Sequence, residues 1–253
     1  LVGAQRMTSL AKYLADLGNE VHVIALTAET MQRTTGNSCR STPPANVTVH
    51  QFDLPEEVPN IFKNELNRAA AFDKVFESIL EQYTFDGLLV TLGPFYTLYS
   101  LKKFVKKYNL PYILDFRDLG SVERMKNDTL ANYIRTHLTE LYAHRVENGA
   151  VKGADYVTVV CPGDVDRMKK AYRIPDDKIS CIFNGYDEER LKGVNCKPAP
   201  SADNVFKIGV FGKFMIYNPE KGPLILKAVD RLRKEGINAQ IVLCPGLNDG
   251  EQL

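Results

Sequence analysis

The fold is decided by residues 154–187, which read ADYVTVVCPGDVDRMKKAYRIPDDKISCIFNGYD. Two runs rich in apolar and β-branched residues, 156–160 and 179–183, flank a segment with helical spacing, 163–172. This order predicts a strand, a helix and a second parallel strand, joined by a right-handed crossover. The second strand ends in an Asn-Gly turn dipeptide. Ligands of open α/β sheets collect along that carboxyl edge of the strands, so we expect the functional site there.

The same alternation of strand and helix extends along most of the chain. Strands are predicted at 20–26, 47–52, 85–91, 109–114, 206–211 and 239–243, and helices at 7–17, within 55–83, and at 96–108 and 223–235. Gly18 closes the first helix, at a position that favours a left-handed backbone. Residues 28–46, rich in Thr, Ser, Asn and Gly, are predicted to form a long loop. The pattern predicts an α/β fold, a doubly wound parallel-sheet Rossmann-like domain followed by an incomplete second one.

The predicted domains are residues 1–190, a linker at 191–204, and 205–253. The linker carries Gly193, Pro198 and Pro200, which is typical of a boundary between domains. A Rossmann-like domain ordinarily begins with a central strand, whereas this chain begins close to a helix. We therefore expect the sequence to be an internal piece of a longer protein.

Composition narrows the class of protein. A net charge of +1 with 25% charged residues gives no reason to expect nucleic acid as a partner. Five cysteines without metal-ligand spacing indicate free thiols in a reducing compartment. No apolar run approaches the roughly 20 residues that span a bilayer. The chain is expected to be soluble and cytoplasmic.

Charged residues stand at the end of an apolar strand. The run 109–114 delivers Asp115, Arg117 and Asp118 to the carboxyl edge of the predicted sheet. We do not expect charged residues at the end of this strand to belong to the core, because burying an unpaired charge costs free energy. They are either a structural Arg-Asp pair or part of a site, and the position at the ligand edge favours a site.

Several weak motifs occur in the order found in a known family. They are Glu147, Ala154-Asp155, the strand 157–160, Tyr172, Lys178-Ile179 and the turn Asn184-Gly185-Tyr186-Asp187. With them the chain resembles the family 4 retaining glycosyltransferases of the GT-B class, which have two Rossmann-like domains. Many members have a histidine where Arg117 stands here.

The resemblance implies a retaining, metal-independent transfer of a sugar from a nucleotide-sugar donor, without a further cofactor, of a kind used in polysaccharide biosynthesis. It implies that Asp115, Arg117 and Asp118 are catalytic. The donor-binding residues that it implies are Gly3, Arg6, Asn184, Gly185, Gly212, Lys213 and Lys221. Lysines and backbone amides suit this role, because the departing diphosphate must be stabilised.

Other functions remain open. A nucleotide-sugar 2-epimerase shares the fold and needs no acceptor, and a non-catalytic α/β binding module is the third hypothesis. The acceptor would be a glycan or a lipid-linked sugar. The predicted helix 96–108 carries Lys102, Lys103, Lys106 and Lys107, which form either a solvated face or a basic patch for peripheral contact with the inner face of a membrane.

Overall fold

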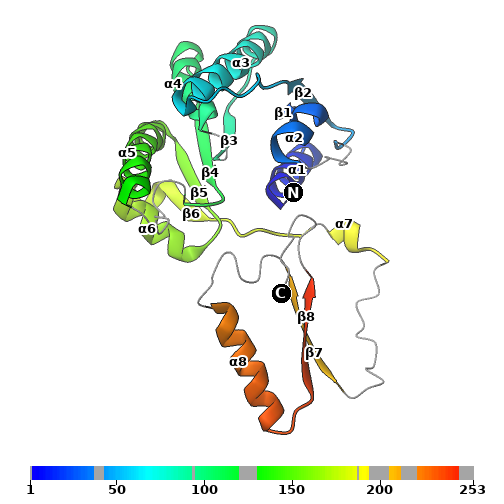
Figure 1. Ribbon diagram of the computed structural model, residues 1–253. Helices are drawn as coiled ribbons and strands as arrows, with labels where there is room; N and C mark the ends of the chain where they lie inside the picture. Colours follow the sequence, from blue (N-terminus) through cyan, green and yellow to red (C-terminus); the bar gives the residue numbers. More distant parts are fainter. Residues whose placement is uncertain are drawn as a thin grey trace. The chain divides into compact units, whose positions relative to one another are not determined.

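The computed structural model describes residues 2–36, 43–92, 95–119, 130–186, 188–193, 205–211 and 221–244. The chain divides into two compact units, Leu1–Glu188 and Glu189–Leu253. Figure 1 shows the elements of both units. The predicted domain bounds at residues 190 and 204 remain predictions, and residues 194–204 of the predicted linker lie outside the described part of the chain.

Helices and strands alternate in both units, as predicted. The first unit contains α1 (Val2–Asp16), β1 (Val21–Leu26), α2 (Ala28–Thr35), β2 (Val47–Phe52), α3 (Ile61–Gln82), β3 (Leu88–Leu92), α4 (Tyr96–Tyr108), β4 (Tyr112–Phe116), α5 (Leu130–Gly153), β5 (Tyr156–Val159), α6 (Pro162–Tyr172), η2 (Asp176–Lys178) and β6 (Ile179–Cys181). The helix α7 (Glu188–Leu191) spans the division between the units, and β7 (Phe206–Phe211), α8 (Lys221–Lys234) and β8 (Ala239–Cys244) follow.

Every strand pair in the described chain is parallel. The first unit contains a four-stranded sheet of order β3-β4-β5-β6 and a two-stranded sheet of β1 and β2. In the second unit β7 pairs with β8. The crossover predicted for residues 154–187 is present as β5-α6-β6. The α/β fold with parallel sheets and a Rossmann-like N-terminal domain is therefore confirmed.

One face of the four-stranded sheet forms the main core. Leu114 and Val157 on adjacent strands are fully buried there. They pack with Leu101 of α4, Val151 of α5 and Met168 of α6. The other face is more open, since Leu89 and Ile113 are 36% and 39% exposed. This open face also carries the polar residues of the candidate site.

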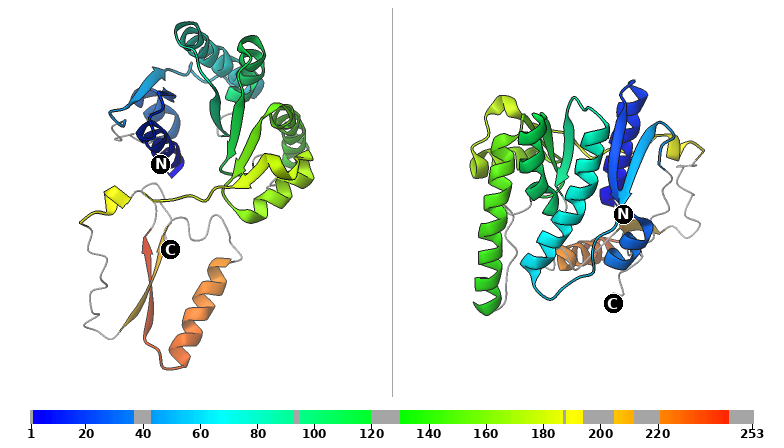
Figure 2. Two further views of the ribbon diagram at one scale, coloured as in Figure 1. Left: turned by 180° about the vertical axis from the view of Figure 1, so that it is seen from behind. Right: turned by 90° about the horizontal axis from the view of Figure 1, so that it is seen from above.

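A second group of apolar contacts joins the two-stranded sheet to the helices. Phe52 of β2 packs edge-on against Phe72 of α3 and Tyr96 of α4. Further along the same helices Phe76 contacts Phe104. The helices α3, α4 and α5 lie side by side in the view from above in Figure 2.

Two predictions about elements need correction. The expected loop 28–46 contains the helix α2, which is capped by Thr27 at its start and by Gly36, at φ 68°, at its end. The first helix begins at Val2 among the described residues, five positions before its predicted start. The left-handed Gly18 is confirmed at φ 90°.

Cys161 and Cys181 are both free thiols. Within the described chain no helix combines the length and the apolar content that crossing a membrane would need.

Candidate functional site

A row of polar side chains crosses the four-stranded sheet near its carboxyl edge. The parallel register places Thr91, Asp115, Thr158 and Ser180 side by side, one from each strand. Paired residues of neighbouring strands point to the same face of a sheet. Strands of parallel sheets are ordinarily apolar runs, so this row marks the open face as a place for polar contacts.

Asp115 lies at the centre of this row and is 1% exposed. The Arg6 guanidinium of α1 donates to it through two nitrogens, Nε to Oδ2 at 2.9 Å and Nη2 to Oδ1 at 2.7 Å. The Thr158 hydroxyl donates to Oδ1 at 2.6 Å. The hydrogen bond with Asp115 raises the pKa of Arg6, against the opposing effect of burial. A buried carboxylate with a bidentate guanidinium partner makes strong, charge-assisted hydrogen bonds.

The same guanidinium also holds the segment that follows β6. Its Nη1 donates to the carbonyl oxygens of Ile182 and Phe183, both at 3.1 Å, and to Oδ1 of Asn184 at 3.3 Å. Arg6 thus connects α1, β4 and the segment 182–184 that follows β6. Asn184 and Gly185 are exposed, and a Cβ at Gly185 would meet nothing within 4 Å. The expected turn at Asn184-Gly185 is absent, because β6 ends at Cys181 and residues 182–186 form neither a turn nor a bend. This segment is instead held by Arg6 and is exposed.

Arg117 and Asp118 follow β4 directly. Arg117 is half-buried, and its Nε has no hydrogen-bond partner among the described residues. Asp118 is exposed. A guanidinium and an accessible carboxylate at the end of one strand can together bind an anionic group and orient a hydroxyl.

The structure brings Arg6 into direct contact with two other predicted site residues, Asp115 and Asn184. Gly3 lies in the first turn of α1, one helical turn before Arg6. Lys221 is the first residue of α8 in the second unit, and its side chain lies outside the described part of the chain. Gly212 and Lys213 also lie outside it. The roles expected of all these residues remain predictions.

Thr158 is a site residue that sequence reasoning missed. Its signal was available, because it is the one polar residue in the apolar strand β5. The carbonyl groups of Ile182 and Phe183 left no signal, since a backbone acceptor does not depend on residue type.

The site shows no metal-binding constellation among the described residues, where no group of three or more His, Cys, Asp or Glu side chains could hold an ion.

Comparison with known proteins agrees with this architecture. The model of Glycosyltransferase Family 4 matches residues 3–190. A search of curated proteins gives no match. Among solved structures the chain is similar to sucrose-phosphate synthase from Thermosynechococcus elongatus, with 15% identity, a TM-score of 0.61, and coverage of 96% of this chain and 57% of that one.

Two further structures share the fold. The glycotransferase of kitacinnamycin is 12% identical, with a TM-score of 0.53 and coverage of 98% of this chain and 64% of that one. The calicheamicin glycosyltransferase CalG4 is 13% identical, with a TM-score of 0.51 and coverage of 97% and 63%. The chain thus spans less than two thirds of the length of these proteins. Because the family model covers most of the chain, the chain belongs to Glycosyltransferase Family 4.

Proposed function

We propose that the protein transfers a sugar from a nucleotide-sugar donor to an acceptor hydroxyl, with retention of the anomeric configuration and without a metal ion. The observation that carries this proposal is the family match over residues 3–190. It is supported by the charged edge of the four-stranded sheet, where ligands of α/β folds bind.

The residues divide into two groups in this proposal. Asp115, Arg117 and Asp118 form the catalytic, acceptor-side group, in which the exposed Asp118 contacts the acceptor. Arg117 supplies a cation at the end of β4, although its Nε is buried, whereas Asp115 is engaged by Arg6 and Thr158. Asp115 therefore acts by fixing the geometry of the edge.

The donor-binding group comprises Gly3, Arg6, Asn184, Gly185, Gly212, Lys213 and Lys221. Arg6 uses its Nε and both Nη atoms within the protein, so it acts by holding Asn184 and Gly185 in position. Lys213 and Lys221 supply the cations for the diphosphate. Fixed cations at the place where negative charge develops lower the barrier to transfer.

The proposed acceptor is a glycan or a lipid-linked sugar. A lipid-linked acceptor lies at a membrane surface, so we place the enzyme in the cytoplasm with peripheral contact to the inner face of a membrane. The lysines of α4, Lys102, Lys103, Lys106 and Lys107, are the residues proposed for this contact.

The test is release of nucleoside diphosphate from a panel of nucleotide sugars, measured on the protein that contains this chain, with and without candidate acceptors. Release that depends on acceptor supports a transferase. Conversion of the donor to its 2-epimer without acceptor, followed by NMR, indicates the epimerase, and no conversion of any donor indicates a binding module. Product anomers are assigned by NMR, and activity in a chelator tests independence from metal.

Lys221→Ala is expected to lower turnover on the order of a hundredfold, as loss of one well-placed donor does. Lys227→Ala is the matched control, because Lys227 is an exposed lysine of the same helix. Equal turnover of the two variants would contradict the role given to Lys221.

A further inference from the structure

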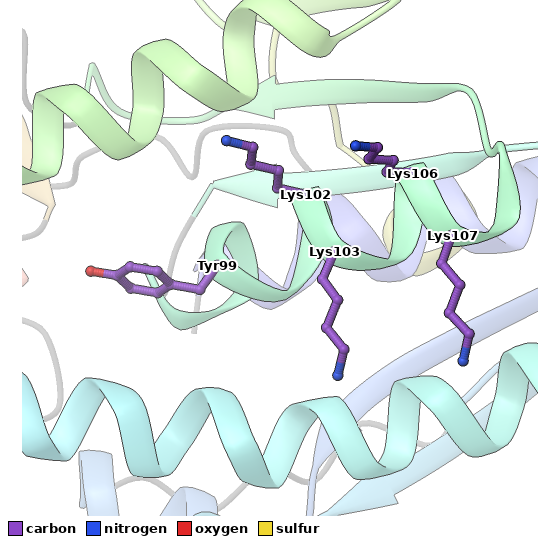
Figure 3. Close-up of a pocket in the computed structure, with 5 residues that line it drawn as sticks. All are labelled: Tyr99, Lys102, Lys103, Lys106 and Lys107. Atoms are coloured by element: carbon purple, nitrogen blue, oxygen red, sulfur yellow. The ribbon is translucent and has the colours of Figure 1, made fainter.

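The outer face of α4 carries a stripe of one tyrosine and four lysines. Tyr99, Lys102, Lys103, Lys106 and Lys107 line a shallow hollow of about 620 Å³, and Figure 3 shows their side chains. The opposite face of the helix is core, since Leu98, Leu101 and Phe104 are at most 3% exposed. The stripe therefore faces away from the packed side of α4.

The four lysines are not equivalent. Lys103 pairs with Asp73 at 3.2 Å, and Lys107 pairs with Glu77 at 2.8 Å. These two side chains point toward α3, whereas Lys102 and Lys106 point away from it (Figure 3). No ion pair of Lys102 or Lys106 is present within the described chain. Acidic residues of α3 thus neutralise the charges of Lys103 and Lys107, whereas the charges of Lys102 and Lys106 are not neutralised by an ion pair among the described residues.

An apolar patch adjoins the hollow through an aromatic chain. Tyr99 contacts Tyr142 of α5 with ring centroids 6.1 Å apart, and Tyr142 contacts Phe62 of α3 at 5.6 Å. Phe62 and Tyr142 are 55% and 41% exposed. Leu66, one helical turn after Phe62, is 61% exposed. Monomeric proteins seldom expose such clusters without a partner.

We infer that Lys102, Lys106, Tyr142, Phe62 and Leu66 form a docking surface for an anionic lipid bilayer. Lysines with uncompensated charge attract a negative leaflet, and their aliphatic stems lie along apolar surface while the ammonium groups reach the head groups. Tyrosine and phenylalanine side chains suit the boundary between head groups and acyl chains. A purely anionic partner would leave the apolar side chains exposed, and a purely apolar partner would leave the two lysines without counter-charges. An anionic bilayer accommodates both kinds of side chain.

This surface differs from the carboxyl-edge site in its residues and in its ligand. It extends the proposed peripheral contact, because apolar side chains take part in it and because Lys102 and Lys106, rather than all four lysines, attract the anionic leaflet. Vesicle binding is measured without donor or acceptor. Absence of vesicle binding would therefore not contradict the proposed transferase activity.

The chain contains no tryptophan, which permits a single fluorescent reporter at the surface. Phe62→Trp should shift its emission to the blue when vesicles of phosphatidylcholine with phosphatidylglycerol are added, and pure phosphatidylcholine should give no shift. Rising salt should weaken binding, because exposed charges are screened. The inference would be overturned if the protein sedimented with anionic vesicles while the emission of the tryptophan at position 62 stayed unshifted. Another surface would then bind the vesicles.

Charge variants supply the second arm of the test. In the Phe62→Trp background, Lys102→Gln with Lys106→Gln should lower the partition coefficient about 25-fold, at roughly fivefold for each lysine near an anionic leaflet. Lys170→Gln with Lys178→Gln is the matched control, because both residues are exposed and lie in α6 and η2. Equal losses in the two double variants would overturn the inference. So would absence of vesicle binding by the chain, or binding to a single-stranded oligonucleotide as tight as to vesicles.

Discussion

Arg6 determines the local geometry of the candidate site, because one guanidinium joins three segments that are distant in sequence. Replacing Arg6 with Gln leaves the Asp115 carboxylate buried without its cation. Removing one partner of a buried ion pair costs about 3–5 kcal/mol. We expect Arg6→Gln to lower the free energy of unfolding by that amount, measured by urea denaturation and far-UV circular dichroism.

A double-mutant cycle separates the pair from other effects of the substitution. Asp115→Asn removes the charge that Arg6 neutralises, so the double variant should lose less stability than the sum of the two single losses. The expected coupling is about 1–3 kcal/mol. Additive losses would mean that the contact seen between the two side chains contributes nothing to stability.

The two members of this pair differ in how far the sequence predicts them. Asp115 was predictable, because an apolar strand that ends in charges is a local pattern. Its partner was not, because Arg6 is separated from Asp115 by 109 positions. No spacing or periodicity encodes a contact of that range, because it depends on where the tertiary fold places α1 relative to β4.

At the scale of elements, the contact between α5 and β4 depends on a glycine. A Cβ at Gly153 would lie 2.6 Å from the Tyr112 hydroxyl, which donates to the carbonyl oxygen of Ala150. Gly153→Ala should therefore displace a buried tyrosine and cost about 1–3 kcal/mol through the lost hydrogen bond. Thermal unfolding followed by circular dichroism measures this.

Gly149 of the same helix is the matched control. A Cβ there would meet nothing within 4 Å, and the position is exposed. Gly149→Ala should stabilise the protein by about 0.5–1 kcal/mol, because alanine favours helix over glycine. Changes of the same sign in the two variants would show that helix propensity, not the Tyr112 contact, decides the effect at Gly153.

The β1–β2 pair carries a pH-sensitive contact. His50 Nε2 and His22 Nδ1 lie 2.9 Å apart, beside Glu20, Tyr83 and Phe85. Burial, and then the charge of His22, lower the pKa of His50. His50 therefore binds a proton less readily in the folded state than in the unfolded chain, where its pKa has the ordinary value of about 6.5. The unfolded state binds more protons there, so stability should fall as pH falls through this value.

Urea denaturation from about pH 8 to about pH 5 tests this, in a range above most carboxyl pKa values. His50→Gln removes the titrating group and should flatten the dependence. An unchanged slope in this variant would assign the effect to another histidine.

The helix α2 shows why one element escaped prediction. Thr, Asn and Gly in residues 28–46 indicated a loop, and most of these residues do disfavour helix interiors. The Thr27 hydroxyl nevertheless accepts from the Thr30 N–H, and both hydroxyls donate to Asp53 at the end of β2. A cap and a tertiary anchor together outweigh weak propensity over two turns. The anchor was invisible in sequence, because Asp53 lies beyond the predicted loop.

At the scale of the whole molecule, the buried core is unevenly divided between the two units. Fifteen buried residues form one cluster around β4 and β5 in the first unit. In the described part of the second unit the buried hydrophobic residues are Val229 and Ala239, while Phe206 and Leu224 are 62% and 60% exposed. Since stability comes chiefly from buried apolar surface, the two units should differ in local stability.

Native-state hydrogen exchange measures this difference strand by strand. We expect amides of β4 and β5 to exchange only by global unfolding, because each has a paired strand on both sides and a fully buried face. Amides of β7 and β8 should exchange through local opening at a much lower free energy, because their two-stranded sheet has little core to lose. A chain ending at Glu188 serves as the control, and its β4 and β5 amides should keep their protection. Equal protection of β5 and β8 would contradict the argument from core size, and loss of β5 protection on truncation would show that the second unit stabilises the first.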